Sequence, residues 1–334
     1  MIELGLGAIH ELDDERLQFA QQLGVQNIIV HTPPLMAAWP QGDASREEVG
    51  GGYWEFLELL QMRRRVDAAG LKLYAIENMP MDFYDKARLG LPGRDQQIEN
   101  VRRIIRNMGR AGIPVLGYHW MLVGVWRTEH TPTGRGGAVV TKYDHGLAEN
   151  APTFEHGEYD DETMWENFEY FLKAVVPVAE EAGVRLALHP DDPPVPNIAG
   201  TARIIRSTEA YKRVIGIVDS PSNCLEFCQG TVSEWCETPE EVYEAIRYFA
   251  SRDKIAYVHF RNVRGTVPKF EETFIDEGKV DMLEAMRAYK ESNFDGVLIV
   301  DHTPGMVGDT RWGHRGRAYG IGYIKALLKC VDGA

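Results

Sequence analysis

The chain has 334 residues, of which 44% are hydrophobic and 26% are charged, a composition typical of a globular protein with a sizeable core. Its formal net charge of -14 at pH 7 argues against nucleic acid and anionic membranes as partners, because both require a basic surface. No signal peptide is expected, and no apolar run approaches the roughly 18 residues that span a bilayer.

Short, β-branched apolar runs alternate along the chain with longer amphipathic segments. Each run is almost continuously apolar, as in strands that are buried on both faces of a parallel sheet. In chain order, the predicted strands are residues 2–9, 27–31, 71–78, 114–120, 185–190, 214–220, 255–262 and 296–302.

Helical periodicity fills the intervals between these strands. Several of the helical segments end at a glycine, which is a common C-cap signal. Thr238, Pro239 and Glu241 form a capping-box pattern, which predicts that a helix begins there. The other predicted helices are residues 13–23, 53–69, 95–111, 164–182, 201–213, 281–291 and 317–331.

Eight strand–helix units in succession favour an α/β fold, a (β/α)8 TIM barrel in which residues 1–334 form a single domain. An open doubly wound sheet is the alternative, but no G-x-G-x-x-G turn follows an early strand, and Gly5-Leu6-Gly7 lacks the third glycine. Two insertions, at about residues 32–52 and 125–161, follow strands. We therefore expect both inserted loops to lie over the C-terminal mouth of the barrel, where barrel active sites form.

Polar side chains stand at the ends of most predicted strands, and the carboxyl ends of barrel strands converge on one mouth. In chain order, these side chains are His31, Glu77, Asn78, His119, His189, His259 and Asp301. Chance explains one such histidine easily, but it explains His189, His259 and Asp301 together poorly. Two imidazoles and a carboxylate are suitable ligands for a borderline divalent ion, so the sequence predicts a metal site at the mouth.

The cysteines add a fourth candidate ligand. Cys228 follows the predicted sixth strand by one loop and can reach the same mouth. Cys224 and Cys228 have C-x3-C spacing, but no second pair accompanies them, so a separate zinc knuckle is not predicted and Cys224 is interpreted as a small buried residue. Four cysteines in a chain of this length do not form a disulfide framework, which favours a cytoplasmic protein with reduced thiols.

Several segments resemble the D-mannonate dehydratase family, whose members have a xylose-isomerase-like barrel. These are L-A-L-H-P-D-D-P-P at 186–194, F-C-Q-G-T at 227–231, V-H-F-R-N at 258–262, D-E-G-x-V-D-M at 276–282 and R-A-Y-G-I-G-Y-I-K-A-L at 317–327. The resemblance is specific from about residue 185 to the C-terminus. It is looser in the N-terminal half, where residues 107–128 are similar to the family's fourth βα unit.

This resemblance implies a hydro-lyase that dehydrates D-mannonate to 2-keto-3-deoxy-D-gluconate. Carried onto this sequence, the family's metal ligands fall on His189, Cys228, His259 and Asp301. The family's catalytic pair falls on His302 and Tyr319. The resemblance implies Mn²⁺ as the metal, whereas a thiolate with two imidazoles would equally suit Zn²⁺, Co²⁺ or Ni²⁺.

A small-molecule sugar acid also requires cations for its carboxylate and partners for its hydroxyls. Arg261, two residues beyond His259, is the best-placed cation, and Arg127 is a weaker candidate. His31, Asn78 and His119 are candidate partners for the sugar hydroxyls. Barrels of this kind often associate, so a homo-oligomer is expected.

Two other functions stay open at this point. One is a metal-dependent sugar isomerase or epimerase of the xylose-isomerase-like group, although those sites usually have two glutamates among their ligands. The other is a barrel that binds a sugar or a metal without catalysis. Cys228 and the adjacent Asp301 and His302 favour the dehydratase over both.

Overall fold

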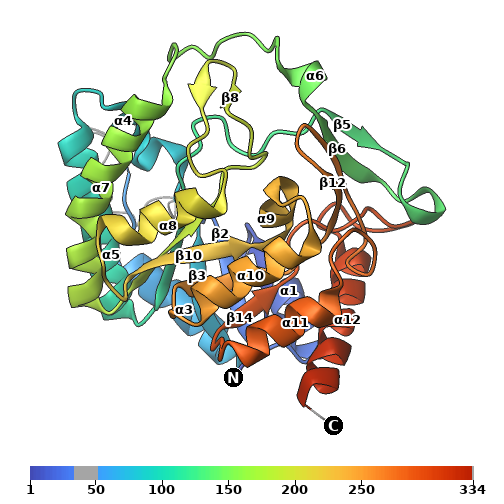
Figure 1. Cartoon of the computed structure of the whole chain (residues 1–334). Helices are drawn as coiled ribbons and strands as arrows, with labels where there is room; N and C mark the ends of the chain where they lie inside the picture. The colour runs from blue at the N-terminus through green and yellow to red at the C-terminus, as the bar shows by residue number, and fades with distance from the viewer. Residues whose placement is uncertain (34–51, 333–334) are drawn as a thin grey trace.

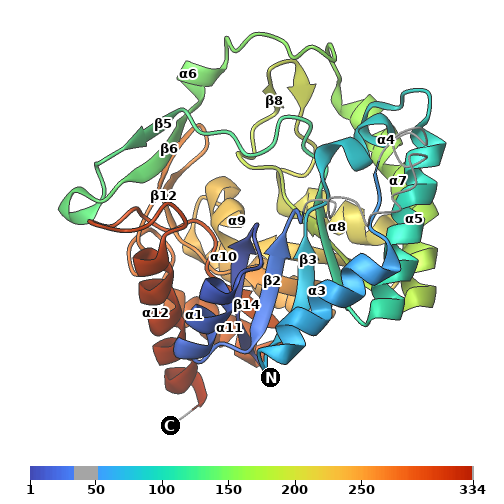
Figure 2. The same cartoon turned by 180° about the vertical axis from the view of Figure 1, so that it is seen from behind.

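A closed barrel of eight parallel strands forms the centre of the molecule (Figures 1 and 2). The computed structural model describes residues 1–33 and 52–332. The barrel order is β1-β14-β11-β10-β7-β4-β3-β2. The strands are β1 (Glu3–Ile9), β2 (Asn27–His31), β3 (Lys72–Glu77), β4 (Val115–His119), β7 (Arg185–His189), β10 (Asn223–Cys228), β11 (Ile255–His259) and β14 (Val297–Ile299). The predicted (β/α)8 fold is confirmed.

Amphipathic helices surround the barrel and bury their apolar faces against its strands (Figures 1 and 2). In α5, for example, Ile104, Ile105 and Met108 are fully buried. The surrounding helices are α1 (Asp14–Gln22), α3 (Phe56–Ala68), α5 (Arg94–Ala111), α7 (Asp161–Ala182), α8 (Thr208–Ile217), α10 (Pro239–Ala250), α11 (Met282–Glu291) and α12 (His314–Asp332). Inside the barrel, side chains such as Ile29, Val115 and Ile299 pack together, so the interior is a core and not a pore.

The prediction of the sixth strand was wrong. Residues 214–217, assigned to a strand at 214–220, complete α8, which Ser207 caps by accepting a hydrogen bond from the Ala210 amide. The apolar Val214–Ile217 stretch resembles a strand, but Tyr211, Val214 and Ile215 follow helical spacing and are buried on one face. The sixth strand is instead β10. Its buried polar residues, Asn223 and Glu226, interrupt the apolar run by which a buried strand is recognised in the sequence. The helix predicted at 201–213 therefore begins later, at Thr208.

The second insertion forms a small antiparallel sheet with the loop that follows β11. Residues 125–161 contribute β5 (Glu129–Thr131), β6 (Val140–Asp144) and the short helix α6 (His145–Ala148). The β11 loop contributes β12 (Val263–Thr266) and β13 (Lys269–Glu272), and the order is β12-β13-β6-β5. We call these four strands the mouth sheet, because they lie beyond the carboxyl ends of the barrel strands (Figure 1).

Shorter elements complete the described chain. They are η1 (Met81–Phe83), α4 (Asp85–Leu89), η2 (Arg135–Gly137), β8 (Asn197–Ile198), β9 (Thr201–Ala202) and α9 (Gln229–Trp235). The first predicted insertion, at about residues 32–52, falls almost entirely outside the described residues. That residues 1–334 form one domain stays a prediction. No helix in the described parts of the chain is long and apolar enough to cross a bilayer.

The predicted capping box at the start of α10 is confirmed. The Thr238 side chain accepts a hydrogen bond from the Glu241 amide, and the Glu241 carboxylate accepts one from the Thr238 amide. Thr238→Ala should lower the free energy of unfolding by about 1 kcal/mol, since one backbone amide loses its partner. Urea denaturation measures this change. Glu244→Ala, on the exposed face of the same helix, is the control and should have a much smaller effect.

Candidate metal centre and active site

The ends of four consecutive barrel strands carry the predicted metal ligands. His189, Cys228 and His259 are the last residues of β7, β10 and β11, and Asp301 follows β14 by two residues. Parallel pairing places Cys228 directly beside His259. Cys228 therefore ends a barrel strand itself, whereas the sequence had placed it one loop away.

Three of the four side chains are grouped closely enough to bind one ion, and the fourth lies beside one of them. The ligand atoms of His189, Cys228 and His259 all lie within 4.8 Å of one another. Asp301 Oδ2 lies 3.3 Å from His259 Nδ1. Nitrogen, oxygen and sulfur ligands bind a transition metal at about 2.0–2.3 Å, so donor atoms at these separations can surround a single ion with small adjustments.

The hydrogen bonds of the two histidines leave one nitrogen of each ring for a ligand. His189 Nδ1 lies 2.7 Å from the Pro190 carbonyl oxygen and donates to it, which leaves Nε2 as an acceptor. His259 Nδ1 is buried and lacks a hydrogen-bond partner among the described residues. A buried imidazole nitrogen without a partner is costly, and a metal ion would satisfy it. The donors present therefore fit a divalent metal.

Electrostatics favour a positive charge at the same point. Burial alone would raise the pKa of the Cys228 thiol, but Arg261 and His189 hold it well below its ordinary value. Burial would lower the pKa of His189, but Glu226 and Cys228 raise it to about 9. Burial likewise opposes ionisation of Asp301, yet His302 and His259 hold the pKa of that carboxyl well below its usual range. Anionic ligands in a buried site are the condition for tight cation binding.

The two predicted catalytic residues line one small cavity beside these ligands. His302 and Tyr319 both border it, together with Phe274 of the loop after β13. His302 Nδ1 lies 2.8 Å from Glu272 Oε1, and its Nε2 lies 3.6 Å from Asp301 Oδ2. Burial alone would lower the pKa of His302, but the Asp301 and Glu272 carboxylates raise it by more, so the pKa lies above its ordinary value.

Tyr319 is the more open member of the pair. Its side chain is 37% exposed, and its hydroxyl accepts a hydrogen bond of 3.4 Å from Arg135. Partial burial raises its pKa above 10, and the nearby Asp276 carboxylate acts in the same direction while Arg135 opposes it. The phenol therefore stays protonated at neutral pH and is better suited to donate a proton than to accept one.

Arg261 does not have the free guanidinium that the sequence suggested. Its side chain is 3% exposed, and hydrogen bonds to protein groups use all five of its N–H positions. Its partners are Asp301, Glu234, Glu272, Asp192 and Thr231. No N–H remains for a substrate carboxylate, so this geometry disfavours the predicted substrate contact.

Arg127 is occupied in a similar way. From the insertion at 125–161, its guanidinium binds both oxygens of Asp192 and also Glu272, at 2.6 Å. These two arginines and the carboxylates between them connect the insertion, the β7 loop, α9 and β13 to Asp301, a predicted metal ligand. The sequence could not identify these partners, because the carboxylates stand in segments whose positions depend on long-range pairing.

His31, Asn78 and His119 lie at the ends of β2, β3 and β4, on the other half of the mouth. His31 Nε2 lies 3.2 Å from Asn78 Nδ2. His119 pairs in register with His189, and burial together with nearby cations lowers its pKa well below the ordinary value, so its ring is neutral. His119 Nδ1 has no hydrogen-bond partner in the described structure, which leaves it available to a ligand.

Two buried carboxylates lie beneath the predicted metal ligands. The sequence pointed to Glu77 only as a polar side chain at a strand end, without a role, and did not single out Glu226. Glu226, within β10, and Glu77, at the end of β3, both lie within 3.3 Å of His259 Nε2. A glutamate inside an apolar segment is a signal that could have identified Glu226, but the error in the sixth strand placed it in a loop.

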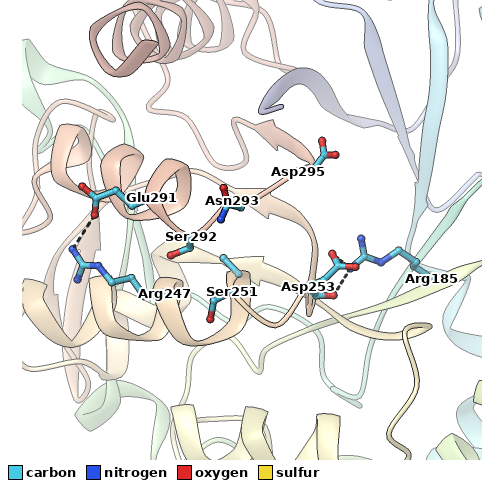
Figure 3. A pocket seen from close by; sticks show the side chains of 9 residues that line it. Arg185, Arg247, Ser251, Asp253, Glu291, Ser292, Asn293 and Asp295 are labelled. Atoms are coloured by element: carbon cyan, nitrogen blue, oxygen red, sulfur yellow. Dashed lines mark hydrogen bonds and ion pairs between the residues drawn. The ribbon is translucent and has the colours of Figure 1, made fainter. Parts of the chain in front are cut away.

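A groove of about 630 Å³ lies at the opposite end of the barrel (Figure 3). Arg185 begins β7, and Asp253 and Asp295 shortly precede β11 and β14, so the groove borders the amino ends of the strands. Its charged side chains pair with one another, as Arg185 does with Asp253 at 3.2 Å and Arg247 with Glu291 at 4.0 Å. It contains neither histidine nor cysteine, which separates it from the metal centre.

Known proteins resemble this chain along most of its length. A mannonate dehydratase from Thermotoga maritima is 34% identical over 326 aligned residues, which cover 84% of this chain and 88% of that protein. One from Lactococcus lactis subsp. cremoris is 30% identical over 322 residues, with the same coverage. The crystal structure of mannonate dehydratase from Streptococcus suis serotype 2 has a TM-score of 0.87 at 30% identity, covering 99% of this chain and 93% of that one.

More distant structures share the fold alone. An L-ribulose 3-epimerase has a TM-score of 0.59 at 14% identity, and the alignment covers 99% of this chain and 96% of that one.

The family model described as D-mannonate dehydratase (UxuA) matches residues 10–156 and 152–334. Together with the strand-end residues above, these matches show that the chain belongs to the D-mannonate dehydratase (UxuA) family.

Proposed function

We propose that this protein is a hydro-lyase that dehydrates D-mannonate to 2-keto-3-deoxy-D-gluconate in hexuronate catabolism. The observation that carries the proposal is the group of His189, Cys228 and His259 at the barrel mouth, with Asp301 beside His259 and His302 beside Asp301. Membership of the D-mannonate dehydratase family supports the same reaction.

The reaction breaks the C2–H and C3–O bonds, releases water and leaves an enol that becomes the 2-ketone. The C2 proton is weakly acidic, and a divalent ion in the proposed site would supply positive charge for the enediolate that develops at the carboxylate. We assign removal of the C2 proton to His302, whose Nδ1 is held by Glu272. Tyr319, protonated at neutral pH, donates to the departing C3 hydroxyl.

We infer the substrate contacts from the hydrogen-bonding groups that contacts within the protein leave free. We propose that Arg261 and Arg127 fix the carboxylates around the site and do not bind the sugar acid, because protein groups occupy their guanidinium groups. His31, Asn78 and His119 are the proposed partners of the sugar hydroxyls, and the buried His119 Nδ1 supports this role.

Mn²⁺ is the proposed native metal, on the basis of the family resemblance, while the donors themselves would also suit Zn²⁺, Co²⁺ or Ni²⁺. A cytoplasmic location and a homo-oligomeric state belong to the same proposal. The isomerase or epimerase alternative is weaker, since those sites usually have several carboxylate ligands, whereas the four ligands proposed here include a single carboxylate and a thiolate.

A panel of hexonates tests the proposal. Protein stripped with a chelator and then supplied with Mn²⁺ should convert D-mannonate to a 2-keto-3-deoxy product, followed by NMR, while the stripped protein should be inactive. An isomer formed without loss of water would support the isomerase alternative. Metal binding without any product from the panel would contradict both enzymes.

A further inference from the structure

The two ring nitrogens of His259 face different surroundings. Nδ1 lies 3.3 Å from the proposed ligand Asp301 and has no hydrogen-bond partner in the described chain. Nε2 faces the barrel interior, where it forms a hydrogen bond of 3.3 Å with Glu77 Oε2 and an ion-pair contact of 2.9 Å with Glu226 Oε1. One edge of the ring therefore faces the metal site, and the other faces two carboxylates.

Glu226 is held firmly in this position. Its side chain is fully buried, and its other oxygen, Oε2, accepts a hydrogen bond of 2.5 Å from the Tyr257 hydroxyl. Gly117 on β4 leaves the space for this pair, because a Cβ there would lie 2.4 Å from the Tyr257 hydroxyl and 3.0 Å from Glu226 Oε2. Three barrel strands, β4, β10 and β11, thus contribute to the placement of one carboxylate.

Burial of these carboxylates calls for a reason, since an ionised group inside a barrel is costly unless it is paired. In the part of the chain that the structure describes, the ion pairs of Glu226 and Glu77 within 4.0 Å are all with histidines, namely His31, His189 and His259. A histidine that binds a metal commonly donates its other N–H to a carboxylate, which fixes the tautomer and strengthens the ligand.

We propose that Glu77 and Glu226 together are positioning residues for the metal centre. Glu77 accepts the Nε2 proton of His259, and Glu226 adds a second negative charge 2.9 Å from the same nitrogen, so that the Nδ1 lone pair is directed to the ion. The proposal rests on the proposed function, because it requires that His259 binds a metal. In this proposal, carboxylates inside the barrel orient a metal ligand at the mouth and strengthen its binding, and Glu226 itself need not contact the ion.

Glu77→Gln and Glu226→Gln test this role while keeping the side-chain volume. The dissociation constant for Co²⁺ is measured by isothermal titration calorimetry on chelator-stripped protein, together with the visible absorption of the Co²⁺ complex. We expect affinity to fall by about 10- to 100-fold, the usual effect of losing the carboxylate behind a histidine ligand. Glu3→Gln is the control, because Glu3 accepts a hydrogen bond from Asn27 at the amino end of the barrel, and the affinity of this variant should stay close to that of the parent.

The outcomes separate the two proposals. If the parent protein does not bind Co²⁺, the proposed function fails. If the parent binds and either glutamine variant binds equally tightly with an unchanged spectrum, only the positioning role of that glutamate is overturned. Should Glu226→Gln fail to fold, Tyr257→Phe replaces it, since this variant removes one anchor of the carboxylate and should weaken Co²⁺ binding to a smaller degree. Unchanged affinity in a folded Tyr257→Phe protein would likewise overturn the role.

Discussion

His302→Asn should lower the turnover number for D-mannonate by about 100- to 10,000-fold, the usual contribution of a general acid or base. Asparagine fills much of the same space and can still contact Glu272, but it cannot take up a proton at neutral pH. Metal content should stay at the parent level, because His302 is not one of the proposed ligands and its Nε2 lies 3.6 Å from Asp301 Oδ2. Steady-state kinetics and elemental analysis of the same preparation measure both quantities.

The control for this variant is His156→Asn, which changes an exposed histidine of the insertion at 125–161. It should retain the turnover of the parent protein. If His302→Asn were as active as the parent, the assignment of His302 to proton transfer would be wrong. If it lost its metal instead, His302 would belong to the metal centre and not to the proton-transfer pair.

Cys228→Ser should weaken metal binding by more than about 100-fold, which exceeds the effect of removing a carboxylate that hydrogen-bonds to a histidine ligand. The pKa of the thiol is held well below its ordinary value, so Cys228 provides a thiolate, whereas a serine hydroxyl stays protonated and is a poor ligand. Titration with Co²⁺ measures the affinity, and the intense sulfur-to-metal absorption band of the parent should disappear.

Cys224→Ser is the matched control, because Cys224 lies in the same strand and is also buried. Its sulfur contacts Arg185 and the Pro221 carbonyl oxygen, far from the barrel mouth, so metal binding and the absorption band should persist. A Cys228→Ser protein that retained the band would remove Cys228 from the ligand set. An equal loss of metal affinity in both variants would support a zinc knuckle formed by Cys224 and Cys228, which the sequence analysis did not predict.

Much of the barrel could be predicted because parallel strands buried on both faces appear as short apolar runs. His189 and His259 follow directly from that rule, since each ends such a run. The sixth strand failed for a related reason. The apolar residues at the end of α8 resemble a strand, and β10 contains the polar Asn223 and Glu226, whose burial only the closed barrel explains.

The site was less predictable where it depends on contacts between distant segments. Arg261 was correctly placed near the mouth, but its partners Glu234 and Glu272 belong to α9 and β13, and the sequence did not identify either element. A single arginine beside predicted ligands is equally compatible with binding a substrate and with neutralising protein carboxylates. Only the packing of those segments decides between them.

The mouth sheet has a consequence for the order in which the chain folds. β6 obtains its partner β13 only across 125 residues, the separation of Asp144 and Lys269. A two-stranded β5–β6 hairpin is marginally stable by itself. During synthesis, the edge of β6 that pairs with β13 therefore stays unpaired until most of the barrel has been synthesised. Arg127 then reaches Glu272, the residue that orients His302. Catalytic competence is therefore gained late, after the scaffold has formed.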